Sequence, residues 1–271
     1  MDHRNHWYGH SAVFARYCGL DPARPPAVAG HIQHGWTFVH GFGNGHRPGN
    51  GVGKFVWSDA CRRRGWARGW RDFYVLGSPW AYLLTMEPEP ARPIERTGTL
   101  WYPFHGWDTN DLCGDHVRLI STIQEVEQGP VTVCLYWLEY ENARIRQMYE
   151  AAGFRVICHG HRDKNPTFLY GQLRELRRHR RVASNRLTTA IFYGISVGCE
   201  PAVYGDPMLM DGVDPNYEGR DLVPRLWPEM HGTDIDPATA RELTVVELGM
   251  DHIAPPAEVR EVFRWPDKRD G

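Results

Sequence analysis

The segment 155–166, RVICHGHRDKNP, has the residue types and spacing that most directly suggest chemistry. An apolar run ends there, and His159, His161 and Asp163 follow at every second position. Alternate residues of an extended segment face the same side, so the three side chains have the spacing of ligands to a metal ion. The next residue is Lys164, whose positive charge would disfavour a cation beside it. Further ligands would have to come from distant positions, and we name His105, Asp206 and His231 as candidates.

A second polar segment, SNRLTT at 184–189, supports a different interpretation. Ser184 and Asn185 are N-cap residue types, and the predicted helix then begins with Arg186, Thr188 and Thr189. Free N–H groups at a helix start, the positive end of its dipole and several hydroxyls together make an anion-binding site. A histidine or arginine from the HGHR segment could complete a clamp on a phosphate group. Taken alone, Ser184 would be no more than a helix cap.

Strands alternating with helices are expected to position both segments. Four apolar runs predict strands at 99–106, 131–139, 154–160 and 200–207, and four intervening segments predict helices at 110–127, 141–152, 166–178 and 186–197. Such alternation indicates βαβ units and a parallel sheet, whose ligand sites lie at the carboxyl ends of the strands. Two further helices are predicted at 237–248 and 256–265.

The region before residue 92 is less regular. Apolar runs at 54–57 and 73–76 predict buried strands, each followed by a turn or a helix-start signal, Ser58-Asp59 and Ser78-Pro79. The glycine-dense segment 41–53 predicts a mobile lid. The segment 87–98 has the proline-rich, charged composition of a linker. We therefore predict an α/β protein with two Rossmann-like domains built on parallel sheets, the N-terminal one small. The expected domains span 1–92 and 98–220, and a helical tail is expected at 221–271.

Composition excludes several classes of protein and favours none strongly. A formal net charge of -2 gives no reason to expect a nucleic-acid partner. The 11 Trp, 12 Tyr and 14 His suit surfaces that bind sugars or bases, although many of these side chains could equally fill cores. The sequence shows neither an apolar run of about 20 residues nor a signal peptide, and its cysteines form no CxxC pair. We expect a cytoplasmic protein, with a peripheral position at the inner membrane face as a variant of that expectation.

The order of the motifs resembles that of GT-B glycosyltransferases. Residues 159–162 and 184–189 are similar to the basic and Ser-rich motifs of enzymes that assemble bacterial surface polysaccharides and natural-product glycans, and Gly198, Pro201 and Tyr204 follow in the same order. The segment GHIQHGW at 30–36 is similar to a cleft-facing turn of the same enzymes. The segment LWYPFHGWDTND at 100–111 resembles the first strand and loop of their C-terminal domain. Within this family, the motifs are most similar to those of CMP-sugar-dependent sialyl- and Kdo-type transferases and of CDP-glycerol polymer transferases. The resemblance covers most of residues 28–208, although Gly160 and Arg162 replace two prolines of the family motif.

The resemblance implies a metal-independent, inverting transfer of a sugar from a nucleotide-sugar donor to a hydroxyl group, with no cofactor. It also implies that 1–92 is the acceptor-side domain and that 98–220 is the nucleotide-sugar-binding domain. The acceptor would be a glycan, a lipid-linked molecule or a small molecule, and a homodimer or partner subunit would complete the short N-terminal half. His34 is the expected catalytic base, and His161 is the second expected catalytic residue. The expected nucleotide and phosphate contacts are His105, His159, Arg162, Ser184, Asn185, Thr188 and Thr189. The expected base or ribose contacts are Tyr136, Trp137 and Glu139.

Two other functions stay open from the sequence. One is a metal-dependent hydrolase that uses His159, His161 and Asp163, and the other is a non-catalytic α/β protein that binds a nucleotide or sugar. The segment CRRRGWARGWR at 61–71 could stack on sugars or bind a polyanionic lipid carrier, or it could be an exposed helix with solvated arginines.

Overall fold

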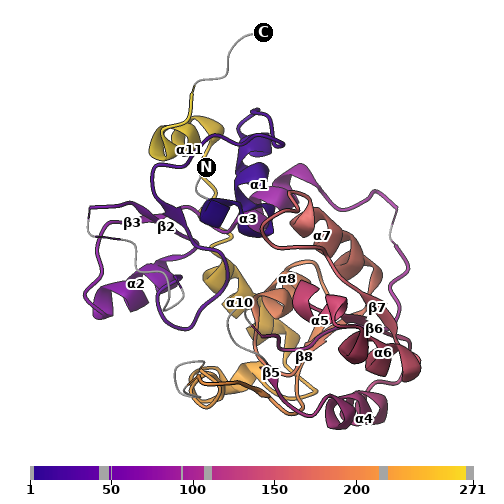
Figure 1. Ribbon diagram of the computed structural model, residues 1–271. Helices are drawn as coiled ribbons and strands as arrows, with labels where there is room; N and C mark the ends of the chain where they lie inside the picture. The colour runs from indigo at the N-terminus through magenta and orange to yellow at the C-terminus, as the bar shows by residue number, and fades with distance from the viewer. Residues whose placement is uncertain are drawn as a thin grey trace. The chain divides into compact units, whose positions relative to one another are not determined.

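The computed structural model describes residues 3–42, 49, 51–92, 94–106, 112–213 and 219–266 (Figure 1). The chain forms two compact units that interleave along the sequence. The first unit contains Met1–Ala91, His161–Gly171 and Leu243–Gly271, and the second contains Arg92–Gly160 and Gln172–Glu242. The first boundary falls inside the proline-rich segment 87–98. The units differ from the consecutive domains 1–92, 98–220 and 221–271, because residues 161–171 and 243–271 belong with the N-terminal strands. Most of the predicted lid at 41–53 lies outside the described residues.

The first unit is built on a three-stranded parallel sheet. Its strands are β1 (His31–Ile32), β2 (Lys54–Val56) and β3 (Phe73–Val75), in that spatial order. Its helices are η1 (His3–Gly9), α1 (His10–Tyr17), α2 (Asp59–Ala67), α3 (Pro79–Met86) and α11 (Pro256–Phe263).

Two helices of this unit begin where the sequence predicts. The Ser58 hydroxyl accepts a hydrogen bond from the Cys61 backbone N–H at 3.1 Å, and the Ser78 hydroxyl accepts one from Ala81 at 3.2 Å. Each bond satisfies a backbone donor that the first helical turn leaves unpaired. Pro79 then occupies the start of α3, where its missing N–H costs nothing.

The core of the first unit includes the C-terminal helix. The Phe263 ring of α11 lies 5.1 Å from the Phe14 ring and 4.7 Å from the Phe55 ring, measured between centroids. The Trp265 indole donates to the Ala27 carbonyl at 3.0 Å. The helix α11 and Trp265 are therefore part of this core. They do not form the separate helical tail that was predicted at 221–271.

The second unit is built on a five-stranded parallel sheet in the order β7-β6-β4-β8-β9. Its strands are β4 (Thr99–Tyr102), β6 (Val131–Cys134), β7 (Arg155–Ile157), β8 (Arg181–Ser184) and β9 (Glu200–Val203). The chain starts at β4, moves outward through β6 and β7, and then returns to the other side of β4 as β8. This reversal makes the carboxyl ends of β4 and β8 the switch point at which such sheets bind ligands. The predicted α/β fold with parallel sheets is confirmed.

Helices and a small antiparallel sheet complete the second unit. The sheet pairs β5 (Leu112–Cys113) with β10 (Leu209–Met210). The helices are α4 (His116–Val126), α5 (Trp137–Glu141), α6 (Ala143–Ala151), α8 (Thr189–Ser196), α9 (Val223–Leu226) and η2 (Pro228–Met230). Two more, α7 (Phe168–Arg178) and α10 (Pro237–Leu248), contain residues of both units.

The predicted boundaries were wrong at the carboxyl ends of the strands. The strand predicted at 131–139 ends at Cys134, and Trp137 and Glu139 lie in α5. The strand β8 was not predicted at all, and the helix predicted from 186 begins at Thr189, because Ser184 is still paired with Val203 in the sheet. These early strand ends leave irregular backbone at the switch point.

Candidate functional site

Asn185 joins two loops at the switch point of the second unit. Its Oδ1 accepts from the Phe104 backbone N–H at 2.7 Å, and its Nδ2 donates to the Asp206 carbonyl at 2.6 Å. The side chain is buried and both ends of its amide are used. Asn185 therefore holds the loops that follow β4 and β9, and a direct phosphate contact from it stays a prediction.

Arg186 is a buried cation at the same edge that was not among the predicted site residues. Its Nε donates to the Pro207 carbonyl at 2.6 Å, and a second guanidinium nitrogen bonds to the Met208 carbonyl. Its Cζ lies 3.6 Å from the centroid of the Phe104 ring. Its position between Asn185 and Thr188 was the signal that could have included it. The guanidinium places positive charge beside the backbone that leads into α8.

The start of α8 differs from the predicted cap. The N-cap is Thr188, and its hydroxyl makes no capping hydrogen bond and is buried without a hydrogen-bond partner among the described residues. Ser184 is fully buried at the end of β8, where its hydroxyl accepts from the Arg186 backbone N–H at 3.3 Å. Ser184 thus supports the turn, while Thr188 and Thr189 stand at the start of α8, the end of a helix that attracts anions.

Three predicted residues from two strand ends come together beside this edge. The rings of His105 and Tyr136 are stacked with centroids 4.0 Å apart and an angle of 16° between planes. Glu139 is buried, and its Oε1 accepts from the Gly106 backbone N–H at 2.8 Å. Its other oxygen, Oε2, has no hydrogen-bond partner among the described residues. The group offers an aromatic surface and a buried acceptor, and Trp137 follows Tyr136 with its ring centroid 6.0 Å away.

His159 lies against β4 in the second unit. Its Nε2 is hydrogen-bonded to the Tyr102 hydroxyl at 3.0 Å, and burial lowers the pKa of its imidazole to about 4. His159 is therefore neutral at pH 7, so a phosphate contact from it, which stays a prediction, would be made without positive charge.

His161 and Arg162 belong to the first unit, and the boundary between units falls directly before them. The Arg162 Nε donates to the Asp163 carboxylate at 3.0 Å, and His161 Nδ1 accepts from the Asp163 backbone N–H at 3.1 Å. Among the ranges that the structure describes, no group of three or more His, Cys, Asp or Glu side chains is placed to hold a metal ion. The HGHRD spacing is thus not supported as a metal site.

Trp7 connects two predicted site residues of the first unit. Its ring meets the half-buried His34 ring edge-on at 4.5 Å between centroids, and the Arg162 Cζ lies 4.4 Å from the Trp7 ring centroid. The backbone is fixed as well, because Tyr8 N–H donates to the Arg162 carbonyl at 2.7 Å. His34 and Arg162 therefore share one aromatic neighbour, which no sequence motif indicated.

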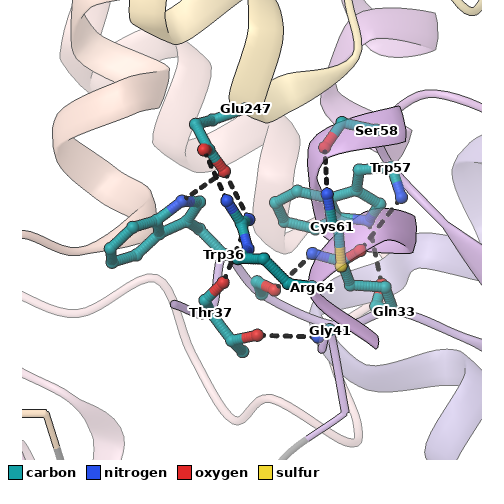
Figure 2. Close-up of polar contacts among 10 residues, drawn as sticks. Gln33, Trp36, Thr37, Gly41, Trp57, Ser58, Cys61, Arg64 and Glu247 are labelled. Atoms are coloured by element: carbon teal, nitrogen blue, oxygen red, sulfur yellow. Dashed lines mark hydrogen bonds and ion pairs between the residues drawn. The ribbon is translucent and has the colours of Figure 1, made fainter. Parts of the chain in front are cut away.

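The turn that carries His34 is held by its neighbour Gln33 (Figure 2). The Gln33 Oε1 accepts from the Trp57 backbone N–H at 2.9 Å, and its Nε2 donates to the Gly35 carbonyl at 2.8 Å. The Trp57 indole donates to the Gln33 carbonyl at 3.0 Å. These bonds join the carboxyl ends of β1 and β2, so the turn at 33–35 is tied to the sheet on both sides.

A buried carboxylate holds the other end of this turn (Figure 2). Glu247 accepts two hydrogen bonds from the Arg64 guanidinium, both at 2.7 Å, and one from the Trp36 indole at 2.8 Å. Arg64 also donates to the Thr37 carbonyl at 3.3 Å. The prediction of solvated arginines at 61–71 was wrong for Arg64, because α2 directs this residue toward Glu247.

Comparisons with known proteins give distant structural likenesses. No protein-family model and no curated protein matches the chain. A candidate UDP-N-acetylglucosamine 2-epimerase from Listeria monocytogenes matches with 11% identity and a TM-score of 0.39, over 78% of this chain and 55% of that one. The wall teichoic acid polymerase TagF matches with 10% identity and a TM-score of 0.40, over 85% and 61%. The lipopolysaccharide outer core galactosyltransferase WaaB matches with 12% identity and a TM-score of 0.28, over 78% and 57%.

In each case the chain spans less than two thirds of the solved protein that it matches. At these identities and TM-scores the likenesses add no argument to the geometry described above. In the part of the chain that the structure describes, no helix is long and apolar enough to cross a membrane.

Proposed function

We propose that the protein transfers a sugar from a nucleotide-sugar donor to a hydroxyl acceptor without a metal ion. The observation that carries the proposal is the carboxyl edge of β4, β6 and β8. Neighbouring loops of this parallel sheet carry two groups of features. One is the start of α8 with the unpaired Thr188 hydroxyl, and the other is the stacked His105 and Tyr136 rings with the Glu139 acceptor. Hydroxyl and N–H donors suit a phosphate, and the stacked rings with a carboxylate suit a base and ribose.

The chemistry of transfer requires stabilisation of the departing nucleotide phosphate. In the proposal, the backbone donors of α8 with Thr188 and Thr189 supply it, and the fixed guanidinium of Arg186 adds positive charge nearby. The roles of His161 and Arg162 as phosphate contacts are part of the same proposal. Their support is the resemblance of their motif, because the two residues lie in the other unit.

Activation of the acceptor is assigned to His34. Its ring is half-buried at the carboxyl end of β1, on a turn that Gln33 and Glu247 hold in place. An imidazole can accept a proton from a hydroxyl near pH 7, and the adjacent Trp7 ring is a surface of the kind on which sugar rings pack. A catalytic histidine distinguishes this proposal from a protein that only binds a nucleotide.

Binding is tested by thermal shift with CMP, CDP, UDP and GDP, each with and without EDTA. The proposal expects at least one nucleotide to raise the melting temperature, and the increase to persist in EDTA. Destabilisation by EDTA together with no response to any nucleotide would contradict it and favour a metal-dependent protein.

Substitutions then locate the two roles. Thr188→Val keeps the shape of a side chain whose hydroxyl makes no hydrogen bond, so it should preserve stability and reduce the nucleotide shift. Thr122→Val, on the surface of α4, is the matched control and should leave the shift intact. His34→Gln should keep the nucleotide shift and abolish release of nucleotide from nucleotide-sugar donors. Full turnover by His34→Gln would remove His34 from the mechanism.

A further inference from the structure

The C-terminal end of α2 and the turn after it present a tryptophan among arginines. Trp66 is 47% exposed, and the side chains of Arg63, Arg68 and Arg71 are exposed near it in the chain. We propose that this surface, formed by Arg62, Arg63, Trp66, Arg68 and Arg71, docks on an anionic lipid bilayer. The inference does not depend on the proposed sugar transfer.

Helix geometry places Arg62, Arg63 and Trp66 on one face of α2, and Arg68 and Arg71 follow at its C-cap and in the turn after it. Positions 59, 62, 63 and 66 fall on one side of a helix with 3.6 residues per turn. The opposite side is committed to packing, since Cys61 is 1% exposed and a Cβ at Gly65 would lie 2.2 Å from the Phe73 ring. Packing of Gly65 against β3 therefore fixes this side of α2, and Trp66 lies on the exposed side.

The charge on this face is predominantly positive. Asp59 is its acidic residue, and it pairs with both Arg62 and Arg63 (Arg63 Nε to Asp59 Oδ2, 2.6 Å). With Arg68 and Arg71 after the helix end, four arginines against one aspartate leave a net charge of +3 on the proposed surface. The nearby Asp72 is matched by Lys54 at 3.9 Å and accepts from the Gly51 backbone N–H at 3.0 Å. Arg64 is not part of the surface, because Glu247 holds it.

The combination fits a lipid surface better than a solvated helix. The Arg62 Cζ lies 4.1 Å from the Trp66 ring centroid, so a guanidinium lies directly against the exposed indole. Tryptophan favours the headgroup region of a bilayer, and guanidinium groups bind phosphates. Each basic side chain near an anionic surface strengthens binding about fivefold. A purely solvated helix would explain the arginines, but it gives no reason for an exposed tryptophan at their centre.

Flotation of the full chain with vesicles tests the proposal. We expect binding to vesicles of mixed phosphatidylcholine and phosphatidylglycerol, weak binding to pure phosphatidylcholine, and weakening by salt. Arg68→Gln and Arg71→Gln should each lower the partition coefficient about fivefold. Trp66→Ser should lower it several-fold at any salt concentration, because the indole contribution is not electrostatic.

Two matched variants control for charge and aromatic content within the same unit. Arg24→Gln removes an arginine that is exposed elsewhere, and Tyr74→Ser removes an aromatic ring that is 41% exposed on β3. Tyr74 alternates with Phe73, so it lies on the sheet face opposite α2. Both controls should bind vesicles as the wild type does, and thermal melts should show all variants folded.

Three results would overturn the proposal. One is equal binding to neutral and anionic vesicles, and another is loss of binding in the controls to the same extent as in the α2 variants. The third is binding that is insensitive to Trp66→Ser and is displaced by a soluble polyanion such as RNA, which would indicate a polyanion site.

Discussion

At the scale of single residues, the Glu247 carboxylate accepts hydrogen bonds from Trp36, which follows the turn that carries His34, and from Arg64 of α2. It is buried, and Arg64 and Trp36 donate three hydrogen bonds to it. A carboxylate in this position matters mainly because its removal would leave a largely buried guanidinium and an indole N–H without their acceptor. Its contribution can be separated from that of an ordinary surface ion pair.

We expect Glu247→Ala to lower the free energy of unfolding by about 3 kcal/mol, because breaking a buried pair leaves an uncompensated charge. Glu87→Ala is the matched control, since Glu87 pairs with Arg16 on the surface and its loss should cost under about 1 kcal/mol. Chemical denaturation measures both values. Equal losses would show that the Glu247 pair is no more than a surface contact.

Burial of His159 predicts how the free energy of unfolding depends on pH. Its pKa is about 4 in the folded protein, lowered from 6.5 by burial, so between these values the unfolded chain binds a proton that the folded chain does not. The stabilisation is full above pH 6.5 and is lost as the pH falls toward 4. Lowering the pH from about 7 to about 5 should therefore cost about 2 kcal/mol through this residue.

The variant His159→Gln should remove this part of the pH dependence. His10 is also buried, with a pKa lowered to about 3, but it is present in both proteins, so the difference between their urea denaturation curves isolates His159. An unchanged slope in His159→Gln would show that His159 is accessible and protonated in the folded protein.

At the scale of elements, the sequence predicted helix starts better than strand ends. Ser58 and Ser78 were identified because an N-cap acts within three residues of itself. The strand β8 was not predicted, and the late start of α8 was missed because Arg186 is fixed by the carbonyls of Pro207 and Met208, more than 20 residues later. Contacts of that range leave no local pattern, and the same holds for the stacking of His105 on Tyr136.

The end of α10 provides a test of close packing between elements. Gly249 has φ of +61°, and a Cβ there would lie 1.8 Å from the Trp57 carbonyl oxygen. Gly249→Ala should cost about 3 kcal/mol, since it adds overlap with backbone to the strain of a left-handed residue. Gly69→Ala, after α2, has a similar φ of +84° with no neighbour within 4 Å, and should cost only about 1 kcal/mol. Similar melting temperatures for the two variants would contradict this packing.

At the scale of the whole molecule, the order of segments along the chain did not predict which segments form each unit. His159 and His161 are two residues apart, and their spacing suggested one site. They fall in different units because the segment after Gly160 is held by the first one, where Tyr8 N–H bonds to the Arg162 carbonyl and Gly9 packs on Pro166. The C-terminal segment joins the same unit through α11. Periodicity predicted this helix, but it contains no information on which sheet the helix covers.

The assembly of the first unit from three segments predicts how the molecule unfolds. Phe263 is fully buried between Phe14 and Phe55, so Phe263→Ala should cost about 4 kcal/mol. Because this core belongs to one unit, amide exchange should accelerate by up to about a thousandfold in β2 and β3 and change little in β4, β6 and β8. Val246→Ala, at a 53% exposed position, should leave every amide unchanged. Acceleration by the same factor in both sheets would show that the two units open together, and the C-terminal helix would then stabilise the whole chain and not only the unit that it completes.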